Sequence, residues 1–137
     1  MRALITASFD ETACTRLERL MTVVHEDWRT RHHIYFDGAA LLRRLADVGA
    51  DVLIVEADMV GADVLQGAGL RMVGCCRGGP VNVDVAAATR LGIPVFHAPG
   101  RNAEVALDLA RAHGRRGEHP VDAARDERLH ADRVELH

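Results

Sequence analysis

Residues 71–102 read RMVGCCRGGPVNVDVAAATRLGIPVFHAPGRN. This stretch combines two short apolar runs, two turns rich in glycine and proline, and an alanine-rich segment between them. It predicts a strand at residues 70–76, a glycine-rich turn at 77–80 and a helix at 84–91. A second strand at 93–97 and a proline-glycine turn at 99–102 follow, and this turn opens another helix. Open α/β sheets bind ligands at the carboxyl ends of their strands. The turn at 77–80 is therefore the first candidate for a binding site.

The preceding residues continue the same alternation of strands and helices. Their apolar runs show no polar alternation, which is typical of parallel strands covered by helices on both faces. Asp10 and Asp37 stand where helix N-caps are expected. The expected strands are residues 2–7, a segment beginning at 23 and residues 51–56, and the expected helices are residues 11–20, 38–50 and 60–68. The chain therefore predicts an α/β fold of the flavodoxin-like type, a three-layer sandwich with a five-stranded parallel sheet and helices on both faces.

Two finer expectations concern side chains near the amino terminus. Leu17, Leu20 and Met21 are spaced to lie on one buried face of the helix at 11–20. The second strand is weaker, and Glu26, Asp27 and Arg29 suit a strand at the edge of the sheet.

The length of 137 residues suits one domain. We expect the domain at residues 1–110, with Asn102 capping a helix that runs to about residue 113. Residues 111–137 contain six arginines, six acidic residues and four histidines, with only scattered Val and Leu. So few apolar residues cannot bury a face, which predicts a polar tail that is loosely packed or disordered.

Composition excludes several classes of protein. The net charge of -3 gives no electrostatic reason to expect nucleic acid. All 17 basic residues are arginine, so a lysine-containing phosphate loop and a Schiff-base lysine are excluded in this chain. No apolar run approaches the roughly 20 residues of a membrane helix. The chain begins with a strand instead of a signal peptide, so a cytoplasmic location is expected.

The glycine-rich turn can be interpreted in two ways. Gly78 and Gly79 would let the backbone approach a ligand closely and offer N–H groups to an anion such as a carboxylate. The alternative is a tight strand-to-helix turn whose geometry needs glycine.

Cysteines and histidines carry weaker signals. Adjacent Cys75 and Cys76 should point to opposite faces of a strand as small buried residues. His97 ends a strand, where it could titrate in a cleft or simply form a hydrogen bond. The histidines show no spacing typical of metal ligands, so no metal site is expected.

A wider pattern extends from the double glycine. It consists of GGPVNVDVAAAT at 78–89, GIPV at 92–95 and APGRN at 98–102. Together these motifs resemble the first domain of the D-isomer-specific 2-hydroxyacid dehydrogenases, in particular the phosphoglycerate dehydrogenase-like branch. The resemblance is close over about residues 50–106 and extends to residues 1–49 only in the order of elements.

The resemblance implies specific roles for residues. Backbone amides of Gly78 and Gly79, with Arg77 beside them, would bind the carboxylate of a small 2-hydroxy or 2-oxo acid. Glu56 and Asp58, at the end of the third strand, would lie near the same cleft. Pro99, Gly100 and Asn102 would form the hinge and helix cap that lead into a dinucleotide-binding domain.

The family's second half is not found in this sequence. It would carry a G-x-G-x-x-G loop for NAD and the catalytic arginine, glutamate and histidine, and no such loop occurs here. We therefore expect the substrate-binding half of an NAD-dependent oxidoreductase acting on the CH–OH group of D-2-hydroxy acids, truncated and inactive alone. No catalytic residue and no bound cofactor are expected in this chain, and its expected partner is the missing domain or a homologous subunit. The alternative is a stand-alone carboxylate-binding or protein-interaction module without catalysis.

Two other flavodoxin-like functions are disfavoured. A phosphoacceptor receiver needs a lysine after the fifth strand, and the chain has none. An FMN flavodoxin needs a glycine-rich loop after the first strand, whereas residues 8–12 contain no glycine.

Overall fold

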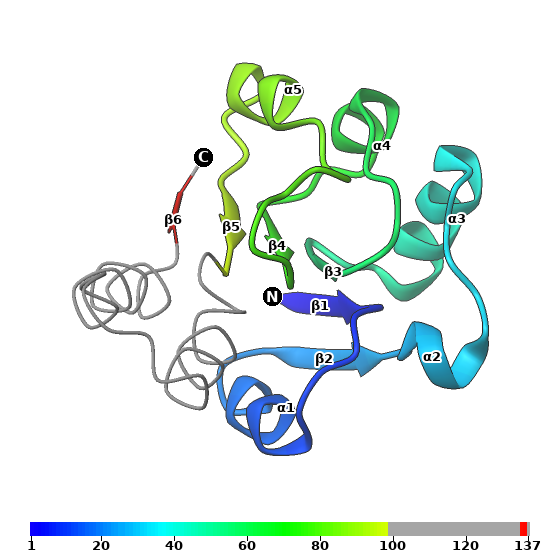
Figure 1. Ribbon diagram of the computed structural model, residues 1–137, viewed down its shortest axis with the longest axis vertical. Coiled ribbons are helices and arrows are strands. Elements are labelled where there is room, and N and C mark those ends of the chain that lie inside the picture. Colours follow the sequence, from blue (N-terminus) through cyan, green and yellow to red (C-terminus); the bar gives the residue numbers. More distant parts are fainter. Residues whose placement is uncertain (99–134, 137) are drawn as a thin grey trace, which may run out of the picture.

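Short apolar strands build one sheet at the centre of the molecule. The computed structural model describes residues 1–98 and 135–136 (Figure 1). The sheet order is β2-β1-β3-β4-β5-β6, in which β1 to β5 are parallel and β6 is antiparallel to β5. The strands are β1 (Arg2–Ile5), β2 (Thr22–His25), β3 (Val52–Val55), β4 (Met72–Cys75), β5 (Val95–His97) and β6 (Glu135–Leu136). The predicted five-stranded parallel sheet in flavodoxin-like order is confirmed, and the two-residue strand β6 is an addition that the sequence did not indicate.

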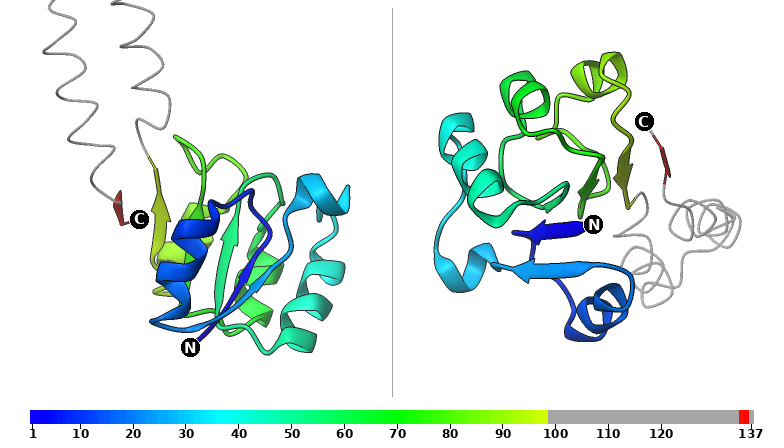
Figure 2. Two further views of the ribbon diagram at one scale, coloured as in Figure 1. Left: turned by 90° about the horizontal axis from the view of Figure 1, so that it is seen from below. Right: turned by 180° about the vertical axis from the view of Figure 1, so that it is seen from behind.

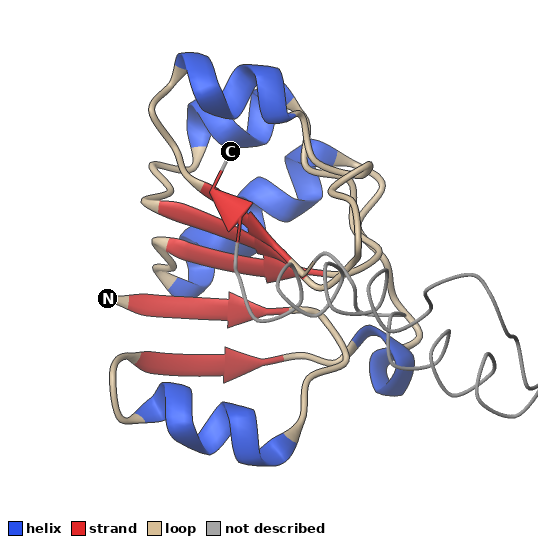
Figure 3. Cartoon of the chain, turned by 60° about the vertical axis from the view of Figure 1, so that its left-hand side comes forward, coloured by secondary structure: helices blue, strands red, loops and turns tan. Residues whose placement is uncertain are grey.

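Helices cover both faces of this sheet (Figure 3). One face packs against Leu41 and Leu45 of α3, Val64 of α4 and Ala88 of α5, all of them buried. The other face packs against Cys14 of α1. A short helix, α2, follows β2 at the carboxyl end of the sheet (Figure 2). The helices are α1 (Glu11–Glu18), α2 (Trp28–Arg31), α3 (Gly38–Val48), α4 (Ala62–Gly67) and α5 (Val85–Arg90).

The helix boundaries follow from local capping. Asp10, Asp37 and Asp84 each accept a hydrogen bond from a backbone N–H in the first turn of the next helix, at 3.2, 3.0 and 3.0 Å. Gly49 ends α3 with φ +69°, a left-handed conformation that favours glycine. The predicted caps of α1 and α3 are confirmed.

One expectation about side chains was wrong and one was confirmed. Leu20 is 76 % exposed, because α1 ends at Glu18 and the chain has turned away before residue 20. The strand β2 lies at the edge of the sheet as expected, and Glu26 after it is buried there because Arg31 of α2 and Arg44 of α3 both pair with its carboxylate. The helix α2, which supplies one of these partners, was not anticipated.

The adjacent cysteines do point to opposite faces. Cys75 is buried with the α3–α5 side of the core, and Cys76 is half-buried against the α1 side. Strand alternation accounts for this arrangement.

The sheet order also positions the binding edge. From β1 the chain first runs outward to β2 and then returns to place β3 on the other side of β1. Such a reversal opens a crevice at the carboxyl ends of the strands. Within the described residues, no helix has the length and apolar character needed to cross a membrane.

Candidate functional site

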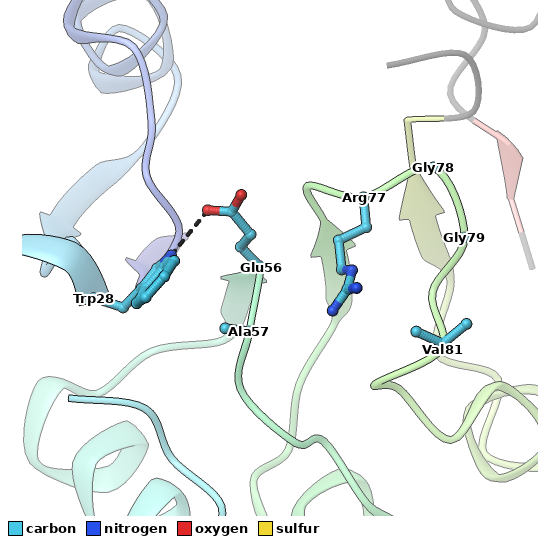
Figure 4. A pocket seen from close by; sticks show the side chains of 7 residues that line it. All are labelled: Trp28, Glu56, Ala57, Arg77, Gly78, Gly79 and Val81. Carbon is cyan, nitrogen blue, oxygen red and sulfur yellow. Dashed lines mark hydrogen bonds between the residues drawn. The ribbon is translucent and has the colours of Figure 1, made fainter. Parts of the chain in front are cut away.

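A cleft lies at the carboxyl ends of β3 and β4, beside the reversal in strand order. It has a volume of about 590 Å³ and is lined by Trp28, Glu56, Ala57, Arg77, Gly78, Gly79 and Val81. In Figure 4, Trp28 and Val81 stand at opposite ends, with Glu56 and Arg77 between them. The structure therefore brings together Arg77, Gly78, Gly79 and Glu56 of the predicted site.

The two loop glycines are not required by the geometry of the turn. In the described part of the chain, the only glycines with positive φ are Gly49, Gly69 and Gly92. A Cβ atom added at Gly78 would meet no atom within 4 Å, and one added at Gly79 would meet only Val81 Cγ1 at 4.0 Å. The explanation that this turn needs glycine therefore loses its support. What the glycines provide is a backbone open to the cleft.

Two hydrogen bonds to the first residues of the glycine loop hold the loop in place. Ala98 N–H donates to the carbonyl of Arg77 at 3.1 Å, and His97 Nδ1 donates to the carbonyl of Gly78 at 2.9 Å. The carbonyl can only accept, so the contact itself assigns the proton to Nδ1. Of the two roles considered for His97, the structure shows the hydrogen-bonded strand end.

The backbone N–H groups of Gly78 and Gly79 have no acceptor in the part of the chain that the structure describes. Neither Gly78 nor Gly79 donates its N–H to an acceptor within residues 1–98. Both glycines are exposed on the wall of the cleft. Two backbone donors without an internal acceptor can bind an anion that enters the cleft.

Glu56 is fixed on the neighbouring strand end by donors from two other segments. Its Oε2 accepts a hydrogen bond from Trp28 Nε1 at 3.0 Å and another from Ser8 N at 3.1 Å. The segments after β1, β2 and β3 thus meet at one carboxylate. Sequence reasoning missed Trp28, although a tryptophan just after a parallel strand should reach the same edge as the other strand ends.

Asp58 does not line the cleft, contrary to its expected place near it. It is 1 % exposed, and its carboxylate accepts hydrogen bonds from Thr6 Oγ1 and from Tyr35 N, the latter at 2.7 Å. The strand ends at Val55, so side-chain alternation no longer places residue 58 on the same side as Glu56. Asp58 holds loops together instead of facing a ligand.

Asn82 connects the two loops that form the cleft. Its buried Nδ2 donates to the carbonyls of Asp58 at 2.7 Å and Glu56 at 3.3 Å, and its Oδ1 accepts from Cys75 Sγ at 3.3 Å. A buried amide with all these partners keeps the glycine loop at a fixed distance from the end of β3. The sequence does indicate this residue, because Asn82 is a polar residue between Val81 and Val83, directly before the helix cap Asp84.

Two buried groups outside the cleft have shifted pKa values. Burial raises the pKa of Glu26, but hydrogen bonds from Arg44 and Arg31 outweigh it, so the pKa lies below its ordinary value. Burial, followed by the charge of Glu18, raises the pKa of the Cys14 thiol. Cys14 Sγ lies 3.6 Å from His25 Nδ1, and a thiol with a raised pKa is a poor nucleophile.

Metal and hinge residues can be placed only in part. Among the residues that the structure describes, no group of three or more His, Cys, Asp or Glu side chains could hold a metal ion. Pro99, Gly100 and Asn102, the predicted hinge and cap, lie outside the described residues, as do the predicted helix to about residue 113 and nearly all of the predicted tail at 111–137.

Comparison with known proteins agrees with the sequence motifs. Residues 3–127 match the family model described as D-isomer specific 2-hydroxyacid dehydrogenase, catalytic domain. A relative from Bacillus subtilis (strain 168), YoaD, bears a name that describes it as a 2-hydroxyacid dehydrogenase; it is 40% identical over 111 residues, which cover 80% of this chain and 32% of YoaD.

Solved structures show the same relationship. The TT0316 protein from Thermus thermophilus is 35% identical, with a TM-score of 0.65 over 82% of this chain and 35% of that one. The 3-phosphoglycerate dehydrogenase of Entamoeba histolytica, solved with NAD+ bound, shares the fold at 18% identity and a TM-score of 0.57, over 82% of this chain and 37% of that one. This chain spans about a third of the length of these relatives.

Proposed function

Because the chain belongs to the D-isomer specific 2-hydroxyacid dehydrogenase family, we propose that its cleft binds the carboxylate of a small 2-hydroxy or 2-oxo acid. The observation that carries this proposal is that the glycine loop exposes its backbone to the cleft. Gly78 and Gly79 are not demanded by φ or by crowding, and their N–H groups have no acceptor in residues 1–98. A bare backbone at the end of a parallel strand suits an anion that must approach closely.

Arg77 adds charge to this anion site. Its side chain lines the same cleft and lies between Glu56 and Val81 (Figure 4). A guanidinium attracts and orients a carboxylate, while the amides fix its position. Asn82 and His97 hold the loop without contacting the ligand, so they act as positioning residues.

In a complete enzyme of this kind, the domain would supply substrate binding to an NAD-dependent oxidoreductase acting on D-2-hydroxy acids. The described residues do not fit the cofactor themselves. The turn after β1 has no glycine, and Asp10 places a carboxylate at the start of α1, where a pyrophosphate would need to lie. Hydride transfer would therefore depend on a dinucleotide-binding domain, in the same protein or in a partner subunit.

A binding module without catalysis is the second candidate. The residues that line the cleft include one carboxylate, Glu56, but no histidine, lysine or tyrosine, so a catalytic histidine would have to come from another domain. Adding NADH and a panel of 2-oxo acids to the 137-residue chain should therefore give no turnover. Steady NADH oxidation that requires the protein would show that the chain carries catalysis by itself.

Amide chemical shifts test the binding proposal directly. Titration of the chain with D-lactate or pyruvate should move the amide signals of residues 77–79 and leave those of α3 unchanged. With half of a closed site present, we expect a Kd of roughly millimolar, about -4 kcal/mol.

Gly79→Val should abolish this response by placing a branched side chain where the anion lies. The fold should tolerate it, since the nearest atom to an added Cβ is 4.0 Å away and φ is not in the left-handed region. Ala46→Val, on the exposed side of α3, adds the same methyl groups away from the cleft and should keep the response. Uniform shifts over the surface, or shifts that persist in Gly79→Val, would show that the loop is a connecting turn and does not bind the acid.

A further inference from the structure

Building on the proposed carboxylate site, we infer that the cleft continues past Val81 into an apolar groove that binds the far substituent of the acid. The acids that fit are 2-hydroxy or 2-oxo acids with an uncharged apolar chain, whereas short acids and dicarboxylic acids fit less well. Three features support this inference: the apolar side chains of the groove, its continuity with the cleft and the charges on its wall.

The groove lies beside the cleft and has a volume of about 350 Å³. Three segments form its apolar wall, with Phe36 before α3, Met59 and Val60 after β3, and Val81 and Val83 before α5. Phe36, Met59 and Val81 are 72, 46 and 79% exposed, and in the described part of the chain they make up half of the large apolar side chains that are exposed. Exposed apolar side chains gathered in one place are typical of a binding surface.

Val81 connects the groove to the cleft. It lines both, and in Figure 4 it stands at the end of the cleft opposite Trp28. Its Cγ1 atom would lie 4.0 Å from a Cβ atom added at Gly79, so Val81 is within contact range of a ligand bound to that residue. The four carbon–carbon bonds from C2 to C6 of a six-carbon acid span roughly 5 Å when extended. An apolar chain that starts at the glycine loop therefore reaches Val81 first and the groove next.

Backbone hydrogen bonds fix the walls of the groove before a ligand enters. Met59 N donates to the carbonyl of Tyr35 at 2.9 Å. Val60 N donates to the carbonyl of Asn82 at 2.8 Å, and its own carbonyl accepts from Asp84 N at 2.9 Å. Three segments thus run side by side, at the spacing of about 5 Å that such bonds impose. Because these walls are already in place, binding an apolar chain orders few additional groups of the protein.

The charged side chains that line the groove are both carboxylates. Asp84 Oδ1 accepts a hydrogen bond from Ala87 N at 3.0 Å as the cap of α5. Asp63 lies against the start of α3, where a Cβ atom added at Gly38 would collide with its carboxylate. A second carboxylate or a phosphate on the acid would meet two like charges here, and an apolar chain would not.

Three 2-oxo acids test the inference on the full 137-residue chain. Pyruvate lacks the chain that would enter the groove. The six-carbon acids 2-oxohexanoate and 2-oxoadipate differ only at C6, which is a methyl group in the first and a carboxylate in the second. Affinities come from amide shifts at residues 77–79. We expect 2-oxohexanoate to bind at least about fivefold more tightly than either other acid, a difference of about 1 kcal/mol. Complete burial of three added methylene groups would give roughly fiftyfold, and a groove open to solvent recovers only part of it.

The same spectra locate the chain of the acid. Bound 2-oxohexanoate should move the amide signals of Met59 and Gly61 in addition to those of residues 77–79. Pyruvate should move only the latter, because it ends before the groove.

Met59→Ser and Val81→Ser should each reduce the preference for 2-oxohexanoate over pyruvate to less than about twofold, since each removes apolar contact area. Both side chains are exposed, so the fold should tolerate the changes. Leu91→Ser is the matched control. Leu91 ends α5 and is 45% exposed, close to the 46% of Met59, but it does not line the groove and its loss should leave the preference intact.

The outcomes distinguish the two proposals. Failure of all three acids to move residues 77–79 would overturn the carboxylate site and this inference with it. If the acids bind but 2-oxohexanoate is not preferred, or if its preference survives both serine variants, the inference fails while the carboxylate site stands. The exposed side chains would then form a surface for another protein domain. Tighter binding of 2-oxoadipate than of 2-oxohexanoate would equally overturn the inference.

Discussion

Two glutamates occupy the same place in the topology, directly after a parallel strand, and the structure uses them differently. Glu26 follows β2 and is buried, with Arg31 and Arg44 paired to its carboxylate. Glu56 follows β3 and lines a cleft, where neutral N–H groups of Trp28 and Ser8 fix it. A carboxylate buried between two arginines stabilises the fold, whereas one on the wall of a cleft lies where a ligand can enter.

The surroundings of each strand end explain the difference. β2 is the edge strand, and α2 and α3 close over its carboxyl end, so that two arginines reach Glu26. β3 is central and its end borders the crevice beside β1. The chain therefore places its structural ion pair at the covered edge and its candidate binding carboxylate at the open one.

Removing an arginine from Glu26 should give the largest effect. Arg44→Met leaves a buried carboxylate with one partly exposed partner, Arg31, and we expect the free energy of unfolding to fall by about 2 kcal/mol. This value lies below the range for fully buried pairs because the Arg44 side chain is 34% exposed and solvent screens part of the interaction. Urea denaturation monitored by circular dichroism measures the change.

A neighbouring arginine provides the control for that experiment. Arg43→Met, on the exposed side of the same helix, should change stability by less than about 0.5 kcal/mol. Equal losses in the two variants would mean that the Glu26 cluster contributes nothing beyond ordinary helix surface.

Sequence patterns predicted the sheet order and most of the cleft because both depend on short-range signals. Apolar runs without alternation identified β1, β3, β4 and β5, and aspartates marked the starts of α1, α3 and α5. The double glycine marked the loop that forms one wall of the cleft. These features are encoded within a few residues of one another.

Contacts between distant segments could not be predicted in the same way. The pairing of Glu26 with Arg44 joins residues 18 positions apart, and the bond from Trp28 to Glu56 joins residues 28 apart. Asp58 was expected near the cleft because it follows a strand, yet Thr6, 52 positions earlier, ties it inward. Which polar side chain turns inward at a strand end depends on partners that only the folded chain brings close.

The lowered pKa of Glu26 predicts how the stability of the fold changes with pH. Its folded pKa is lowered, so its contribution to stability is present above the unfolded pKa and is lost as the pH falls through the folded pKa. Each unit of lowering corresponds to about 1.4 kcal/mol. Urea midpoints measured at pH 7 and at successively lower pH down to about 3 should therefore converge for wild type and Glu26→Gln. A stability difference that stays constant over this range would show that the ion pairs do not control the charge of Glu26.

The smallest expected change in the free energy of unfolding is that of Glu56→Gln, at the open strand end. Glu56→Gln keeps an oxygen for Trp28 and Ser8, so the free energy of unfolding should change by no more than about 0.5 kcal/mol. Glu56→Ala, which leaves the Trp28 and Ser8 donors without that acceptor, should lose more, about 1 kcal/mol. Urea denaturation of both variants beside Arg44→Met gives the full series. A loss in Glu56→Gln as large as that in Arg44→Met would make Glu56 a second structural anchor, and the contrast between the covered and the open strand end would disappear.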